Sequence, residues 1–309
     1  MNQLILGDNV EILRQMESET VDLIYLDPPF FSNRTYDVVW GDKGEVRSFE
    51  DRFSGGIDHY IAWLKERVVE MHRILKPTGS IFLHCDWHAN AYIRVFILDP
   101  IFGTNNFRNE IVWFYRRWTN SSSSFQNMHD LIFWYAKSSQ YKTFNQSETL
   151  PSEYTLKRMD MGWHTNTVRY EGGRRKQYIV YDRAKFEKNC KKIDPNARIV
   201  YREAATPKVA PPDVLEIPIL NSQSNERIGY PTQKPEELLH KLIFTASNEG
   251  DTVLDPFVGG GTTLAVADKL GRHWIGIDQS VAAIKVTESR LQQIGAAFET
   301  ILNIQTTTQ

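Results

Sequence analysis

The sequence is poor in cysteine and in long apolar runs, and both absences limit what the chain can be. Its 309 residues contain two cysteines, Cys85 and Cys190, which excludes a framework of several disulfides. The longest apolar runs, such as residues 21–26, are far shorter than the roughly 20 residues that cross a membrane. The first residues also lack the basic start and apolar run of a signal peptide. We therefore expect a globular chain without a membrane partner, located in a reducing cytoplasm.

The chain as a whole also lacks an excess of charge of one sign, because its formal net charge is −2. This average hides a segregation. Residues 108–208 contain 19 Lys or Arg against 10 Asp or Glu, whereas the remainder contains 17 against 28. A basic segment of this kind can attract phosphates, although a solvated lysine-rich surface explains the same charge.

Apolar runs and amphipathic stretches alternate along most of the chain, which is typical of a parallel sheet with crossover helices. Strands are predicted over 3–6, 21–26, 80–84, 110–115, 131–136, 252–254 and 274–277, and helices after the N-cap Asp8 and over 57–75, 235–247, 262–270 and 280–294. Residues 138–225 show no clear period. The pattern predicts an α/β fold with a doubly wound, mostly parallel sheet, formed by residues 1–118 and 227–309 and interrupted by an inserted irregular unit over 119–226.

A glycine turn follows one of the predicted buried strands near the end of the chain, in the segment TVLDPFVGGGTT at 252–263. Glycines let a nucleotide approach the backbone, and the next helix presents free N–H groups. Asp278 lies 17 residues beyond Gly261, a spacing that suits a carboxylate binding ribose hydroxyls. Leu264 replaces the third glycine of the dinucleotide fingerprint, so a nicotinamide cofactor is disfavoured, and a tight turn without a ligand is the alternative.

The tetrapeptide DPPF, residues 27–30, directly follows the apolar run VDLIYL. Its prolines remove two N–H donors, which leaves the Asp27 carboxylate and the Pro28 carbonyl as acceptors beside the Phe30 ring. This set suits a planar group that carries an exocyclic amine. The near copy DPIF at 99–102 has no such context, so the tetrapeptide alone is weak evidence.

Taken together, the ordered motifs resemble the amino-methylating DNA methyltransferases that use S-adenosylmethionine, in the permuted (beta) group whose catalytic motif precedes the cofactor motif. The resemblance rests on LGDNVEIL at 6–13, DPPF at 27–30, LKPTG at 75–79, EIVW at 110–113, HDLIFWYAKS at 129–138, YPTQKP at 230–235 and DPFVGGG at 255–261. It implies a Rossmann-like methyltransferase fold in which residues 1–118 are the catalytic half, 119–226 recognise the target and 227–309 bind the cofactor. The cofactor-binding residues that it implies, together with Asp278, are Asp8, Thr232, Lys234, Asp255, Phe257, Gly259 and Gly261.

The resemblance also implies the reaction, which is methyl transfer to an exocyclic amine of a flipped-out base in double-stranded DNA, in restriction-modification or epigenetic marking. Asp27, Pro28, Pro29 and Phe30 would be the catalytic residues. Asp at the first position is typical of the enzymes that methylate adenine at N6, whereas Ser is typical of those that methylate cytosine at N4. The alternative within the family is cytosine-N4 methylation. The more remote alternatives are a nucleotide-dependent oxidoreductase, a non-catalytic DNA-binding homologue, and a methyltransferase that acts on RNA or protein.

Basic side chains in the middle of the chain are candidates for DNA contacts, with Trp118, Trp163 and Tyr170 as stacking partners. The candidates are Arg116, Arg117, Lys157, Arg158, Arg174, Arg175 and Lys176. Similar enzymes pair as homodimers, and any DNA cleavage would belong to a separate restriction endonuclease. We interpret the cluster of His84, Cys85, Asp86 and His88 as strand-end polar residues near the pocket rather than as metal ligands.

Overall fold

A computed structural model describes residues 2–31, 35–40, 45–50, 55–117, 123–145, 157, 160–170, 173–201, 211–221 and 223–302, with the backbone alone at 35–40, 45–50 and 170. The chain divides into two compact units. The larger unit consists of residues 1–145 and 212–309, and the smaller unit of residues 146–211. None of the helices in these described ranges is both long and apolar enough to cross a membrane.

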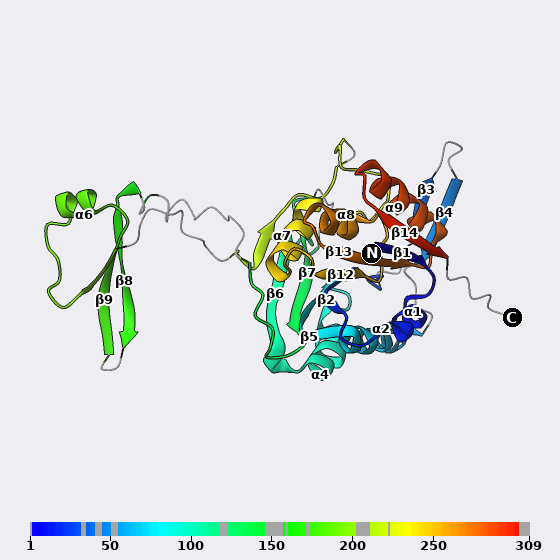
Figure 1. The fold of residues 1–309 in the computed structure, drawn as a ribbon, viewed down its shortest axis with the longest axis horizontal. Helices are drawn as coiled ribbons and strands as arrows, with labels where there is room; N and C mark the ends of the chain where they lie inside the picture. Colours follow the sequence, from blue (N-terminus) through cyan, green and yellow to red (C-terminus); the bar gives the residue numbers. More distant parts are fainter. Residues whose placement is uncertain are drawn as a thin grey trace. The chain divides into compact units, whose positions relative to one another are not determined.

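A nine-stranded sheet forms the centre of the larger unit, in the order β11-β6-β7-β5-β2-β12-β13-β1-β14 (Figure 1). Its strands are β1 (Asn2–Leu6), β2 (Val21–Leu26), β5 (Leu75–Cys85), β6 (Phe107–Phe114), β7 (His129–Ala136), β11 (Val214–Glu216), β12 (Thr252–Asp255), β13 (His273–Asp278) and β14 (Phe298–Leu302). Of these strands, β7 alone runs antiparallel to its neighbours. The predicted mostly parallel sheet is confirmed, and the carboxyl ends of the other eight strands lie at one edge.

Helices cover both faces of this sheet, so alternate strand residues face two separate hydrophobic cores. Along β2, Leu23 and Tyr25 belong to one core, and Ile24 and Leu26 belong to the other. The first core contains residues of α7 (Glu236–Ala246), α8 (Thr262–Lys269) and α9 (Val281–Gln293), and the second contains residues of α1 (Asn9–Gln15) and α2 (Gly56–Ile74). Strands buried on both faces explain the near-continuous apolar runs in the sequence.

Several elements of the larger unit differ from the prediction or were not predicted. Strand β5 begins at Leu75, directly after α2, because Leu75 already pairs with Val21 of β2, whereas we expected a strand over 80–84 only. The unpredicted elements are β11, β14, the antiparallel hairpin of β3 (Thr35–Trp40) and β4 (Glu45–Glu50), and the helical turns α3 (Asn90–Ile93), η1 (Arg94–Leu98), α4 (Asp99–Phe102) and η2 (Thr104–Asn106). The near copy DPIF is thus a helical turn rather than a strand end.

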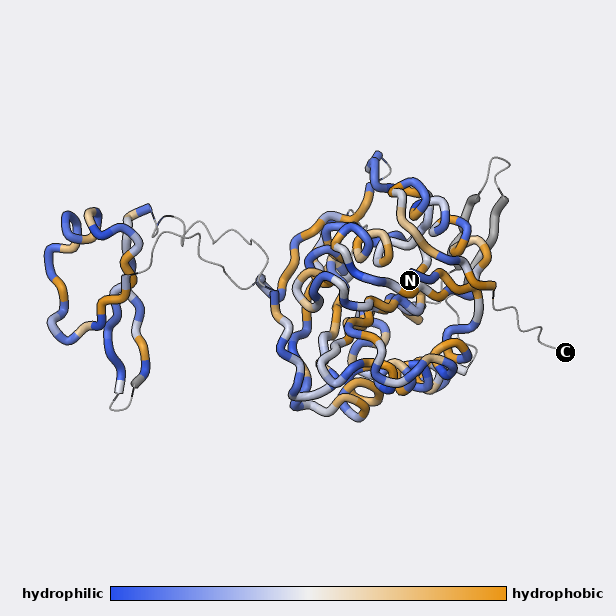
Figure 2. Tube along the Cα trace, in the orientation of Figure 1, coloured by the Kyte–Doolittle hydropathy of each residue, from blue (hydrophilic) through white to orange (hydrophobic). Residues whose placement is uncertain are grey.

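The smaller unit contains a three-stranded sheet in the order β10-β9-β8, which corrects our expectation of an irregular insertion. Its elements are β8 (Trp163–Tyr170), β9 (Gly173–Val180), α6 (Arg183–Asn189) and β10 (Arg198–Tyr201). A small core of Tyr178, Val180 and Phe186 packs against Trp163. Figure 2 shows that β9 is hydrophilic beside the hairpin turn and hydrophobic at its other end, which hides the period of two in the sequence.

The smaller unit is also narrower than the predicted insertion over 119–226. Strand β7 pairs with β5 and β6, and β11 pairs with β6, so both belong to the large sheet. Residues 123–145 and 212–226 therefore extend the α/β body, and the separate unit is limited to 146–211.

Candidate active site

One pocket lies at the carboxyl edge of the sheet, where the segments after β1, β2, β12 and β13 meet. Eleven of the twelve residues predicted as catalytic or cofactor-binding line it, although those roles stay predictions. They are Asp8, Asp27, Pro28, Pro29, Phe30, Thr232, Lys234, Asp255, Phe257, Gly259 and Asp278. The twelfth, Gly261, does not line the pocket, and it lies at the N-terminal end of α8.

The glycine turn is shaped by close packing as much as by backbone freedom. Gly259 and Gly261 have φ angles of +52° and +71°, in the left-handed region that favours glycine. A Cβ on Gly259 would lie 3.0 Å from the Tyr230 ring, and one on Gly261 would lie 2.7 Å from Thr287. The turn therefore brings its backbone to the pocket with no room for side chains.

Two carboxylates, at the carboxyl ends of the neighbouring strands β12 and β13, hold this turn in place. Asp278 accepts hydrogen bonds from the Gly259 amide, at 2.9 Å, and from the Ser280 amide, at 2.8 Å. Asp255 accepts from the Phe257 amide at 2.9 Å, and burial raises the pKa of Asp255 to about 7. Each of the two Asp278 carboxylate oxygens accepts one hydrogen bond from a backbone amide. Each oxygen can accept a second hydrogen bond, which is available to a ligand hydroxyl.

Asp8 is held from behind by an arginine that the sequence analysis missed. Arg67 of α2 contacts the Asp8 carboxylate at 3.1 Å, donates to Asn9 at 2.7 Å, and lies over the Trp63 ring. Asp8 also accepts from the Val10 amide, which confirms it as the N-cap of α1. Arg67 occupies a core position in the helical spacing of α2, beside the buried Val68, and a charged residue at a core position was the overlooked signal.

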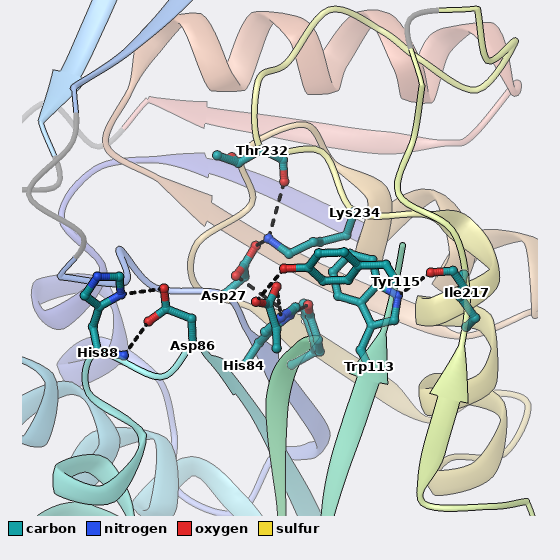
Figure 3. Close-up of polar contacts among 11 residues, drawn as sticks. Asp27, His84, Asp86, His88, Trp113, Tyr115, Ile217, Thr232 and Lys234 are labelled. Atoms are coloured by element: carbon teal, nitrogen blue, oxygen red, sulfur yellow. Dashed lines mark hydrogen bonds and ion pairs between the residues drawn. The ribbon is translucent and has the colours of Figure 1, made fainter. Parts of the chain in front are cut away.

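Asp27 of the DPPF tetrapeptide and Lys234 are in direct contact (Figure 3). One oxygen of Asp27, Oδ2, accepts a hydrogen bond from the Lys234 ammonium, which also lies 5.2 Å from the centre of the Phe30 ring. The same ammonium donates to the Thr232 carbonyl at 3.4 Å. Lys234 was predicted as a cofactor-binding residue; it lines the pocket and bonds to the carboxylate that was predicted to be catalytic.

A buried polar network around His84, near the carboxyl end of β5, lies beside Asp27 (Figure 3). His84 has no exposed side-chain surface, and its Nδ1 is 2.9 Å from the Tyr25 hydroxyl. On its other side, Nε2 is 3.3 Å from Asp130, which also accepts from the Tyr115 hydroxyl at 3.0 Å. Burial opposes ionisation of Asp130, yet the bonds from His84 and Tyr115 hold its pKa below the usual value.

The side chains of His84, Cys85, Asp86 and His88 do not converge on one point. His84 faces Asp27, whereas the Cys85 thiol is buried in the core on the α2 face. Nδ1 of His88 is 2.7 Å from the Asp86 carboxylate, and the His88 ring stacks on Trp87. Among the described residues, no group of three His, Cys, Asp or Glu side chains is placed to hold a metal ion.

The predicted DNA-binding residues fall in both units. Arg116, with 80% of its side chain exposed, and Arg117 follow β6 in the larger unit. Arg174, Arg175 and Lys176 are exposed on β9 of the smaller unit. Lys157 is also exposed, and Arg158 and Trp118 lie outside the described residues. Among the predicted stacking partners, Trp163 instead packs against Tyr178 and Phe186, and only the backbone of Tyr170 is described.

Comparison with known proteins identifies the class of protein that this fold and pocket define. The family of DNA methylases that act on N6 or N4 amines matches residues 21–289, so the chain belongs to this family. Among curated relatives, it is 30% identical over 280 residues to the type II methyltransferase M.BamHI of Bacillus amyloliquefaciens, covering 90% of this chain and 54% of the relative. It is 27% identical to M.BglII of Bacillus subtilis, covering 90% of this chain and 65% of the relative.

The chain covers a larger share of another curated relative. The chain is 28% identical over 289 residues to the DNA adenine methyltransferase YhdJ of Escherichia coli K12, covering 93% of this chain and 82% of that protein. The chain thus spans between about half and four fifths of the lengths of these three relatives.

Solved structures share the fold. A protein described as a DNA modification methylase of Thermus thermophilus, crystallised with S-adenosyl-L-methionine, superposes with a TM-score of 0.59 at 17% identity, covering 99% of this chain and all of that one. The cytosine-N4-specific PvuII DNA methyltransferase gives a TM-score of 0.56 at 16% identity, covering 97% and 95%. The Rossmann-like methyltransferase fold is therefore confirmed.

Proposed function

We propose that this protein transfers a methyl group from S-adenosylmethionine to the N6 amine of an adenine that is flipped out of double-stranded DNA. The observation that carries the proposal is the meeting of two motifs in one pocket: DPPF after β2 and the glycine turn after β12. The Thermus relative in fold binds this cofactor by its description, and the family of the chain supports the same cofactor.

The residues of the pocket fit the proposed cofactor. The spare acceptor sites on Asp278 suit ribose hydroxyls, and the glycine backbone leaves space for the amino-acid portion beside Thr262 and Thr263 of α8. Phe257 and Pro256 offer an apolar wall for the adenine ring. When bound, the cofactor supplies an electrophilic methyl group on a sulfonium, so the protein needs no covalent nucleophile.

Asp27 and Phe30 would bind the target base. The Lys234 ammonium on Asp27 Oδ2 marks a site where the carboxylate binds an N–H donor, and we infer that the base amine takes this site with the ring against Phe30. Acceptance of the amine protons by Asp27 and the Pro28 carbonyl would localise the nitrogen lone pair and stabilise its developing positive charge. Stacking on Phe30, worth about 1–3 kcal/mol, would offset part of the few kcal/mol that base flipping costs.

Adenine is the proposed base because aspartate is the first residue of the tetrapeptide, and the relative YhdJ is named as an adenine methyltransferase. The structural neighbour PvuII, which is named as cytosine-N4-specific, has the same fold, so the fold does not choose between the two amines. We further infer that the smaller unit, residues 146–211, contributes to target recognition through its basic hairpin. A homodimer and a partner endonuclease stay predictions from the resemblance.

A nucleoside assay tests the reaction, the cofactor and the base together. The purified protein is incubated with unmethylated genomic DNA and isotopically labelled S-adenosylmethionine, and the digested nucleosides are identified by mass spectrometry. Labelled N6-methyladenine is the expected product. Label on N4 of cytosine would overturn the choice of base, and a protein that binds no cofactor in calorimetry would overturn the methyltransferase assignment.

A further inference from the structure

His84 is a buried ionisable side chain beside the residues proposed to be catalytic, and the proposed reaction leaves it without a role. Its side chain has no exposed surface, and its Nδ1 is 3.9 Å from Asp27 Oδ1. This oxygen of Asp27 is buried and accepts no hydrogen bond from the described residues. The unsatisfied face of the catalytic carboxylate is therefore the face that lies toward His84.

The same imidazole also supports the catalytic ring. The Phe30 ring centre is 5.3 Å from that of His84, and Trp113 meets His84 edge-on at 5.6 Å. Trp113 is fixed in turn, because its indole N–H donates to the Ile217 carbonyl at 2.8 Å. His84 thus lies between a fixed indole and Phe30, and it adjoins both side chains that would bind the base.

A carboxylate partner determines which imidazole nitrogen carries the proton. Asp130 is an acceptor when it is ionised, so Nε2 of His84 carries the hydrogen that is donated to Asp130. Nδ1 then offers a lone pair, which accepts from the Tyr25 hydroxyl. In this tautomer, His84 presents no N–H to Asp27, and the carboxylate stays available for an amine.

We propose that His84, held by Asp130, is a positioning residue that fixes the Asp27 carboxylate and the Phe30 ring for the target base. This inference rests on the proposed function. Small displacements of reacting groups cost about a hundredfold in rate, so a buried support shared by two catalytic side chains has a large effect without touching the substrate.

The groups that face His84 are Tyr25 and Asp27 from β2 and its end, Asp130 from β7, and Lys234, which bonds to Asp27. The hydrogen-bond partner of Nδ1 is the Tyr25 hydroxyl at 2.9 Å, and Asp27 Oδ1 lies farther away, at 3.9 Å. His84 therefore supports the Asp27 carboxylate by packing against it rather than by bonding to it.

His88 provides a matched control, because it too is paired with a carboxylate and it follows the same strand. Its partner is Asp86 and its ring neighbour is Trp87, whereas His84 lies beside Asp27 and Phe30. The variants are His84→Ala, His84→Gln and His88→Gln. Glutamine can still donate to Asp130 but cannot become charged.

Single-turnover methylation, calorimetric binding of S-adenosylmethionine and DNA binding are measured for each variant. We expect His84→Ala to lower the single-turnover rate about a hundredfold, with both dissociation constants within about twofold of wild type. His84→Gln should recover much of that loss, whereas His88→Gln should behave as wild type. An equal loss in both glutamine variants, an unchanged rate in His84→Ala, or a His84→Gln rate no higher than that of His84→Ala would overturn the proposal.

A spectroscopic measurement separates this inference from the proposed function. Imidazole nitrogen NMR on histidine-labelled protein identifies His84 as the signal that is lost in His84→Gln, and it requires no activity. We expect the Nε2–H tautomer for the neutral ring, and an Nδ1–H tautomer would overturn the positioning argument. A wild-type protein that shows the expected tautomer but methylates no DNA would instead contradict the proposed function.

Discussion

At the scale of single residues, the Asp27 carboxylate is set apart from similar groups by what surrounds it. Asp27 directly follows the buried strand β2, has 17% of its side chain exposed, and directs one oxygen to Lys234 and the other to a buried histidine. The near copy Asp99 lies in a helical turn, where it accepts from the Tyr135 hydroxyl at 2.6 Å. Identical dipeptides therefore have different chemistry, because one lies at the carboxyl edge of the sheet.

Replacing Asp27 with alanine tests this difference. We expect Asp27→Ala to reduce methylation by at least about a thousandfold, within the range of lost acid–base groups, because no carboxylate then accepts from the base amine. Cofactor affinity should stay within about threefold, as measured by calorimetry. Asp99→Ala is the control and should retain activity while losing some stability. A joint loss of cofactor binding in Asp27→Ala would mean that Asp27 supports the fold of the pocket.

The residues of the pocket differ in how far the sequence could predict them. Asp27 and Asp278 were predictable because each lies at the end of a recognisable buried strand. Arg67 was missed, although a charge at a core position of the amphipathic helix α2 was a signal, and His84 was expected only to lie near the pocket. Both take their roles from partners distant in the sequence. Lys234 was found by its motif, but its partner was not, since Asp27 lies 207 residues away.

At the scale of elements, the turn after β12 contains a buried carboxyl, and this makes the stability of the fold depend on pH. Burial raises the pKa of Asp255 from 3.8 to about 7. The unfolded chain therefore releases this proton at lower pH than the folded chain. The resulting stabilisation is fully present below about pH 3.8, and it is lost as the pH rises through about 7.

Asp255→Asn should remove this dependence while keeping an acceptor for the Phe257 amide. We expect the free energy of unfolding of wild type to fall more between pH 5 and pH 8 than that of the variant, by up to about 3 kcal/mol. Urea unfolding at the two pH values gives the comparison. Parallel changes in the two proteins would show that Asp255 is not protonated in the fold.

The glycine at the start of α8 gives a second prediction at this scale. Gly261→Ala requires a left-handed φ, which costs roughly 1–2 kcal/mol, and adds a Cβ 2.7 Å from Thr287. Gly295, at the end of α9, has a similar φ of +75° but open space around its Cβ position. Gly261→Ala should therefore lower the free energy of unfolding more than Gly295→Ala, and it alone should weaken cofactor binding. If thermal unfolding showed the same loss of stability in both variants, the close approach of the Gly261 Cβ position to Thr287 would not affect stability.

Whether a helix or strand could be predicted from the sequence depends on how it is buried in the fold. Helices α2, α7 and α9 were predicted because each buries a single face against the sheet, which gives a clear period. The strands of the smaller unit were missed because β9 is basic in its first half and buried only in its second. A small core can order such a strand, but it leaves little periodicity in the sequence.

At the scale of the whole molecule, the excess of basic charge lies in the part of the chain that includes most of the smaller unit. The basic segment 108–208 includes the smaller unit up to residue 208, whereas residues 227–309 contain more acidic than basic side chains. Protein contacts to the DNA backbone depend on basic charges and weaken with salt, whereas the pocket proposed for methyl transfer does not require them. The two tasks should therefore be separable by substitution.

The hairpin of β8 and β9 is the place to test this separation. Arg174, Arg175 and Lys176 lie beside its turn, and Arg174 is directly opposite Arg169, so like charges face each other across the strands. Such repulsion is tolerated at a stability cost and is relieved when phosphates bind between the charges. Replacing all three with alanine should weaken DNA binding and reduce the slope of log K against log salt by roughly 0.9 for each phosphate that the variant no longer neutralises.

Substituting Lys188, Lys191 and Lys192 with alanine is the matched control, since it removes three exposed charges from the same unit but none from the strands of the hairpin. Its salt slope should change less if the three basic residues beside the hairpin turn are the ones that contact phosphates. Both triple variants should bind S-adenosylmethionine as wild type does, because the pocket lies wholly in the larger unit. A hairpin variant whose slope matches that of wild type would remove β9 from the DNA interface, and recognition would then have to use Arg116 and Arg117 of the larger unit.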